Sequence, residues 1–235
     1  MKTLKLTFWL LTLSFSLYAQ QRQARDISDF DRVIFEGRGE LILSPARQVG
    51  MEIEAKDGVD LSQIKTYTEG RTLHIEYDRD NDDILDVYPK VTVYLSFTDL
   101  EELHCYGVVD ARTTDPIINE SFYYQAEGVG SSRLQVETDR LTVEIAGTAN
   151  LYLSGTAYRE VILLEGTGTL DAFDLIAEEV AAELNGLGSV YVHANQSLFV
   201  DANGFAAQVK YKGNPPKKNI RKSGWVNIKQ VVNNE

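Results

Sequence analysis

Residues 143–151 read VEIAGTANL and form the centre of one unit of a repeat that runs through the second half of the chain. Apolar and polar side chains alternate before Gly147, as in a β-strand with one buried face. A glycine returns at separations of 21, 19, 19, 20 and 18 residues, which gives six corner glycines: Gly107, Gly128, Gly147, Gly166, Gly186 and Gly204. A period of this size predicts stacked supersecondary units.

Equivalent positions of the repeat share their chemistry. The position two before each glycine is apolar in all six units: Cys105, Ala126, Ile145, Leu164, Leu184 and Ala202. The position two after the glycine is small, with one valine as the exception: Val109, Gly130, Ala149, Gly168, Gly188 and Ala206. The position four after it is mostly apolar: Ala111, Ser132, Leu151, Leu170, Val190 and Gln208. Each unit therefore reads as a strand, a tight corner and a second strand.

One such unit cannot bury its apolar face alone, whereas stacked copies can. We therefore predict an all-β fold, a right-handed parallel β-helix with coils of about 19 residues that pair about 4.8 Å apart. The hand follows from the preference of parallel crossovers. A βαβ arrangement would need longer units, and the leucine-rich repeat pattern is absent from the sequence.

The chain before the repeat alternates strictly over several short stretches. Residues 33–43 contain a further Gly-x-Gly corner, and residues 51–55, 73–77 and 91–95 are predicted strands with one wet face. Their irregular spacing predicts an N-terminal cap of longer and partly antiparallel strands. Residues 215–235 are expected to close the other end, because an open end of the stack is an exposed sheet edge.

The first 19 residues have the pattern of a secretory signal peptide. Lys2 and Lys5 precede a short apolar run, and cleavage is expected after Ala19. Residues 20–235 are then predicted to form a single domain, exported to the periplasm, the cell surface or the medium. No later stretch of the sequence is long and apolar enough to predict a membrane span.

The charge and the cysteine content exclude some functions. The formal net charge is −12 and becomes −14 without Lys2 and Lys5, so nucleic acid is an improbable partner. The single cysteine, Cys105, cannot form an internal disulfide. It falls in the apolar column, where we expect a small buried hydrophobic residue rather than a catalytic thiol.

The ends of the repeat region resemble a known family. The residues that carry the resemblance are FEGRG at 35–39, LHCYG at 103–107, VKYKGNP at 209–215 and SGWV at 223–226. They are similar to the "putative auto-transporter adhesin, head GIN domain" family of exported Bacteroidetes proteins, although no Gly-Ile-Asn triplet is present. The resemblance implies a β-helical exported domain with an adhesion role and implies no catalytic residues.

One acidic residue per unit is expected on the outer face: Glu127, Glu144, Glu165, Glu183 and Asp201. Paired carboxylates could bind a cation or act on a sugar, as in glycoside hydrolases. A solvated acidic face that keeps the protein soluble is the simpler interpretation.

Other metal and nucleophile signatures are weak. The acidic loop at 78–83 lacks the Gly and Glu that a calcium loop of the EF-hand type requires. The three histidines, His74, His104 and His193, have no zinc-site spacing. The sequence therefore predicts no cofactor.

Residues 210–229 reverse the charge of the chain. They contain seven basic residues and no acid: Lys210, Lys212, Lys217, Lys218, Arg221, Lys222 and Lys229. This segment could dock on anionic glycan or lipid headgroups, or it could merely offset the acidic repeat. Tyr211 and Trp225 flank it and could stack on sugars, although Trp225 could equally cover the core.

The sequence thus favours a non-catalytic envelope protein that binds a cell-surface glycan or an envelope protein. The alternative is a polysaccharide-acting β-helix enzyme that uses surface carboxylates. The sequence leaves the oligomeric state open.

Overall fold

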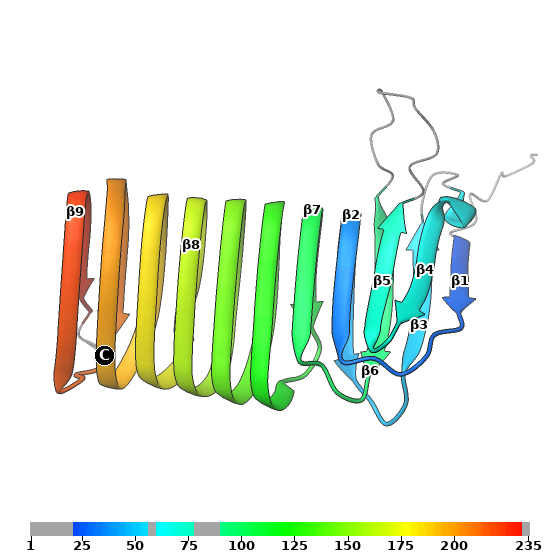
Figure 1. The fold of residues 1–235 in the computed structure, drawn as a ribbon, viewed down its shortest axis with the longest axis horizontal. Helices are drawn as coiled ribbons and strands as arrows, with labels where there is room; N and C mark the ends of the chain where they lie inside the picture. Colours follow the sequence, from blue (N-terminus) through cyan, green and yellow to red (C-terminus); the bar gives the residue numbers. More distant parts are fainter. Residues whose placement is uncertain (1–20, 56–59, 78–89, 232–235) are drawn as a thin grey trace, which may run out of the picture.

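A computed structural model describes residues 21–55, 60–77 and 90–231 of the chain (Figure 1). Apart from one short 3-10 helix, η1 (Leu61–Gln63), the elements are all strands. They are β1 (Gln21–Arg25), β2 (Arg32–Pro45), β3 (Gly50–Ala55), β4 (Ile64–Glu69), β5 (Thr72–Tyr77), β6 (Val91–Phe97), β7 (Glu102–Thr113), β8 (Ile117–Lys212) and β9 (Lys217–Gln230). The all-β prediction is confirmed.

The strands form one long mixed sheet in the order β1-β3-β6-β2-β7-β8-β9. From β2 onward in this order, neighbouring strands are parallel. β2 pairs in parallel with β7, β7 pairs in parallel with β8, and β8 pairs in parallel with β9. Figure 1 shows that β8, the longest element, winds through successive turns that lie side by side. Each turn therefore contacts the one before it and the one after it.

The corner glycines lie next to one another in this stack. Gly107 is the register partner of Gly37 on one side and of Gly128 on the other, and Gly204 is the partner of Gly224. The row thus extends beyond the six glycines of the period to include Gly37 and Gly224. At Gly166, φ is +122° and a Cβ would lie closer than 3.0 Å to the carbonyl oxygen of Gly147. Both the backbone angle and the close packing therefore require glycine there.

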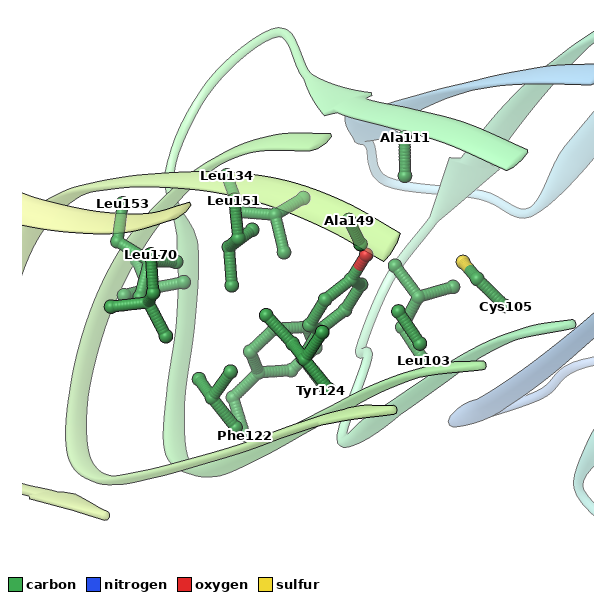
Figure 2. Packing of buried hydrophobic residues seen from close by; sticks show 14 of the residues in the cluster. Leu103, Cys105, Ala111, Phe122, Tyr124, Leu134, Ala149, Leu151, Leu153 and Leu170 are labelled. Carbon is green, nitrogen blue, oxygen red and sulfur yellow. The ribbon is translucent and has the colours of Figure 1, made fainter. Parts of the chain in front are cut away.

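The apolar columns of the repeat face inward and form one continuous core. In the part shown in Figure 2, Phe122 and Tyr124 pack between Leu103 on one side and Leu151 on the other. Cys105 belongs to the same cluster and is a free thiol. Full burial of a leucine or phenylalanine contributes about 1.5 to 3 kcal/mol, so the stack is held together mainly by these columns.

The last unit departs from the predicted alternation. Ala206 is exposed with φ +62°, and the register between β8 and β9 shifts between Phe205 and Ala207. This β-bulge inserts one residue and turns the following side chains to the opposite faces. Ala207 and Val209 are therefore the buried residues, and the prediction that Ala206 and Gln208 continue the inward columns is wrong.

The N-terminal part contains the antiparallel pairs expected of a cap. β3 lies between β1 and β6 and is antiparallel to both, and β4 is antiparallel to β5. The strands expected at 51–55, 73–77 and 91–95 are present as β3, β5 and β6, whereas β4 was not predicted. The turn at Gly58 and the acidic loop at 78–83 lie outside the described residues.

One buried carboxylate stands in a column that is otherwise apolar in the turns of β8. Glu160 is fully buried, and both of its carboxylate oxygens are without a hydrogen-bond partner. Its equivalents, six residues before the other corner glycines of β8, are buried apolar residues: Phe122, Leu141, Val180 and Leu198. Burial raises the pKa of Glu160 to about 8. The side chain is therefore largely protonated at neutral pH.

Candidate functional site

Three of the five predicted outer acids meet at one place on the stack. Glu127, Glu144 and Glu165 line a shallow depression, together with Gln125 and Leu163. Glu144 stands three residues before its corner glycine, whereas Glu127 and Glu165 stand one before theirs. The carboxylates therefore zigzag between two rows instead of forming one column. The amide of Gln125 donates a hydrogen bond of 2.8 Å to Glu127.

The other two acids lie further along the stack, each beside a different neighbour. Glu183 accepts a hydrogen bond of 3.1 Å from the side-chain amide of Asn185. Asp201 is the register partner of Arg221 in β9. The structure therefore separates the five acids into a group of three and two single residues, which makes a common site for all five impossible.

The described part of the chain contains no group of three or more His, Cys, Asp or Glu side chains placed to hold a metal ion. His104 makes polar contacts of 2.8 Å with Gln125 and 2.9 Å with Glu102, on the outer face. The neighbouring Cys105 points inward, and burial raises the pKa of its thiol to about 12. A His–Cys nucleophile pair is thus ruled out at these two positions.

The C-terminal end of the stack reverses the charge of the surface. Residues 161–209 contain seven carboxylates and no Lys or Arg, and residues 210–229 contain the seven bases and no acid. Five of those bases are on β9, where all residues from Lys217 to Trp225 are exposed. The charge of the C-terminal coils therefore changes sign over the width of one strand.

The bases of this segment differ in their surroundings. Lys210 and Lys212 are half-buried, and their ammonium groups lie 5.0 Å from the ring centre of Tyr191 and 4.5 Å from that of Phe173. Arg221 lies 5.9 Å from the ring centre of Phe199. Such cation–π contacts hold the basic groups against aromatic faces. The remaining bases of β9 extend into solvent.

The two aromatic residues singled out in the sequence have opposite environments. Trp225 is 73% exposed and stacks on Phe205, with ring centres 4.8 Å apart. It therefore does not cover the core. Tyr211 is only 7% exposed and belongs to the core, so its expected place on the binding surface must be corrected. The bulge at Ala206 is the reason, because it reverses the faces of all following residues in β8.

A row of exposed side chains, of which the sequence analysis singled out only Trp225, runs along the corner. It consists of the residues that follow the corner glycines, here called the corner ridge: Val108, Val129, Thr148, Thr167, Leu187, Phe205 and Trp225. Val108 pairs with Val129 and Phe205 with Trp225 in adjacent turns. From Thr167 onward each member is larger than the one before. Aligning the residue after each glycine would have revealed this row.

Two lysines of β9 lie at positions whose register partners in the preceding turn face the core. Lys218 and Lys222 are the register partners of Leu198 and Ala202, which are both buried. Ile220 lies between them, opposite Val200. Inward-pointing charges at the last strand are one way in which proteins block edge-to-edge association. The end of the stack is therefore closed by long side chains with charged tips.

The family is settled by comparison with known sequences. A family model described as "Putative auto-transporter adhesin, head GIN domain" matches residues 29–215. The chain belongs to this family. None of the curated proteins matches the sequence. The matched range of the head GIN domain includes all six corner glycines and ends just before β9.

Solved structures share the architecture at low sequence identity. The crystal structure of a putative adhesin from Bacteroides fragilis is 22% identical, with a TM-score of 0.83 over 91% of this chain and 97% of that one. A putative lipid binding protein from Parabacteroides distasonis is 19% identical, with a TM-score of 0.68 and coverage of 91% and 97%. A putative adhesin from Parabacteroides merdae is 17% identical, with a TM-score of 0.64 and coverage of 91% and 96%. At these identities the likeness concerns the fold.

Helices play little part in this head GIN domain. Within the described ranges, no helix is long and apolar enough to cross a membrane.

Proposed function

We propose that this head GIN domain is a non-catalytic binding module of the cell envelope that contacts an anionic partner through the C-terminal end of its stack. The observation that carries this proposal is the combination found on β9. β9 carries five exposed bases and no acid, together with Trp225, which stacks on Phe205. Such a combination provides long-range attraction and large apolar contact area on one surface.

The winding of the chain and the hand of that winding are part of the same proposal. We infer a right-handed parallel β-helix with an N-terminal cap, in residues 20–235 as one domain. The parallel registers and the row of glycines support the winding, and the hand follows from the preference of parallel crossovers. An experimental structure of residues 20–235 tests both.

Export is the second part of the proposal. Residues 1–19 have the composition of a signal peptide, and adhesion requires a location outside the cytoplasm. N-terminal sequencing of the protein recovered from the envelope or the medium should give Gln20 as the first residue. A recovered chain that begins at Met1 would contradict export by this route.

The partner is proposed to be a cell-surface glycan or an envelope protein with negative charge. A glycan array probed together with an envelope pull-down should show retention that falls with salt, because the attraction is electrostatic. The matched comparison is a triple variant that neutralises Lys217, Lys218 and Lys222 by Gln. Equal retention of the variant and the wild type would contradict the proposed surface.

The alternative is a polysaccharide-acting enzyme that uses Glu127, Glu144 and Glu165, which share a depression. A general acid needs a raised pKa and access to substrate. Glu160 has a raised pKa but is fully buried, so it cannot reach a polysaccharide. Incubation with uronic-acid and neutral polysaccharides should release no sugar. Release that is abolished by Glu144→Gln or Glu165→Gln would establish the enzyme instead.

A further inference from the structure

We infer that the end surface of the stack, formed by β9 with Phe205 and Leu187, docks on an anionic lipid bilayer. This inference rests on the proposed function and names the partner class of the same surface. The contact is peripheral: the apolar side chains enter the interfacial region, and the bases lie at the level of the headgroups.

The apolar part of this surface is the large end of the corner ridge. Leu187, Phe205 and Trp225 are 49%, 61% and 73% exposed, and they follow glycines that stack directly on one another. Large exposed apolar groups in one row mark interaction sites. Because these side chains are exposed in a row, they can enter a soft interface, whereas small-molecule sites are concave. Tryptophan is also the residue that favours the membrane–water interface.

The basic part lies on the same strand as Trp225. Lys217, Arg221 and Lys229 are exposed, and Lys218 and Lys222 extend their charged tips beyond the end of the core. Each Lys or Arg near an anionic membrane surface strengthens binding by about fivefold. The bases and the ridge can therefore act on one partner, because β9 carries both the exposed bases and Trp225.

The acids of the preceding coils restrict the orientation of this contact. Residues 161–209 contain seven carboxylates and no Lys or Arg, and they belong to the turns next to β9. An anionic bilayer would be repelled by those carboxylates. The C-terminal end of the corner ridge can approach it, and because the ridge runs along the stack from Leu187 to Trp225, the stack is inclined with β9 nearest to the bilayer. A bilayer uses both the charges and the whole apolar ridge, whereas a polyanion without sugar rings would use the charges alone.

Vesicle binding by residues 20–235, the proposed mature chain, tests the inference, because the apolar segment of residues 1–19 would itself bind vesicles. Trp225 is the one tryptophan in residues 20–235 and serves as the tryptophan fluorescence reporter. Vesicles of phosphatidylcholine with 30 mol% phosphatidylglycerol, chosen as about a third anionic lipid, should shift its emission to the blue and co-sediment with the protein. Pure phosphatidylcholine vesicles should do neither. Raised salt should release the protein.

A charge-matched pair of variants identifies the surface. Replacing Lys217, Arg221 and Lys229 by Gln should lower the affinity for anionic vesicles by about a hundredfold, at about fivefold per charge. Replacing Arg47, Lys65 and Lys90 by Gln removes the same charge from exposed positions of the N-terminal part and should change the affinity little. Trp225→Ser should weaken binding while leaving every charge in place. Thermal melts confirm that each variant is folded.

The outcomes separate the lipid inference from the proposed function. Vesicle binding that is equal in the two triple variants, or equal for both lipids, overturns the inference. Binding to dextran sulfate or polygalacturonate without any binding to anionic vesicles also overturns it, yet leaves the anionic-partner proposal standing. Failure to bind vesicles and both polymers overturns the inference and the proposed surface together.

Discussion

Gly166 lies so close to Gly147 in the preceding turn that a Cβ on Gly166 would overlap the carbonyl oxygen of Gly147. The same relationship recurs between Gly147 and Gly128 and between Gly186 and Gly166. The spacing of adjacent turns at this corner is therefore set by backbone contacting backbone, with no side chain between.

Gly166→Val should destabilise the protein by about 2 kcal/mol or more, because it combines a clash with an unfavourable φ. Urea denaturation measures the loss. Gly50→Val is the control, since Gly50 has ordinary space around it and no left-handed φ. Gly70→Ala separates the two causes, because Gly70 has φ +60° and no heavy atom near a Cβ. If Gly50→Val were the costlier change, the glycine row would not define the corner.

Leu164→Asp should unfold the chain, because it places a charge in a dry column. Leu163→Asp is the matched control one residue earlier, where the side chain is half-buried on the outer face. Circular dichroism should show a lost or strongly lowered melt for the first variant and a small shift for the second. Equal melts would mean that the strand faces are assigned wrongly.

Glu160 should make the protein less stable as the pH rises. Its pKa is about 8 in the folded state and about 4.5 in an unfolded chain, so the folded state binds the extra proton between these values. Stability then falls by up to about 1.4 kcal/mol for each pH unit in this window. Urea denaturation at pH 5 and pH 8 should show a smaller decline for Glu160→Gln than for the wild type.

Other titrating groups contribute equally to both proteins, so the difference between them isolates Glu160. Glu160→Leu restores the apolar residue of the other turns and should be more stable than the wild type at pH 8. Parallel pH profiles for the wild type and Glu160→Gln would contradict a buried, protonated carboxyl group.

Lys218 and Lys222 should keep the molecules from stacking end to end. Replacing both by Leu extends the buried columns of Leu198 and Ala202 to the open end of the stack. Light scattering after size exclusion should show concentration-dependent association beyond that of the wild type. Replacing Lys217 and Lys229 by Leu serves as the control. Both lysines are also exposed, so this change adds the same apolar area outside the buried columns.

Cys105 should resist alkylation in the folded protein. Its thiol is 3% exposed, and burial raises its pKa, so little thiolate is available. Labelling with iodoacetamide should be slow in buffer and rapid in urea, and mass spectrometry follows it directly. Rapid labelling without denaturant would place the thiol on the surface.

Much of the architecture could be predicted because it depends on a regular signal. The alternation around Gly147 and Gly166 indicated the buried columns, and the period indicated the corner. The bulge at Ala206 could not be predicted, since a positive φ at alanine has no sequence signature. The same bulge explains the error at Tyr211, whose face depends on one inserted residue.

The candidate surface was only partly predictable. The basic character of residues 210–229 is visible in composition, but their division between half-buried and exposed groups depends on the rings of Phe173 and Tyr191 in other turns. The partner of Trp225 lies twenty residues away in Phe205, and only the register between β8 and β9 brings them together. Long-range pairings of this kind are set by the stacking and not by local sequence.

The glycine row has a consequence for the evolution of this chain. Each turn presents the next one with the same carbonyl oxygens at the same corner, so a turn can be duplicated or deleted as a whole without a new interface having to arise. Proteins with different numbers of turns can then have identical terminal strands. Gene-level gain or loss of single coils would change how far the end strand stands from the N-terminal cap while leaving the terminal chemistry intact.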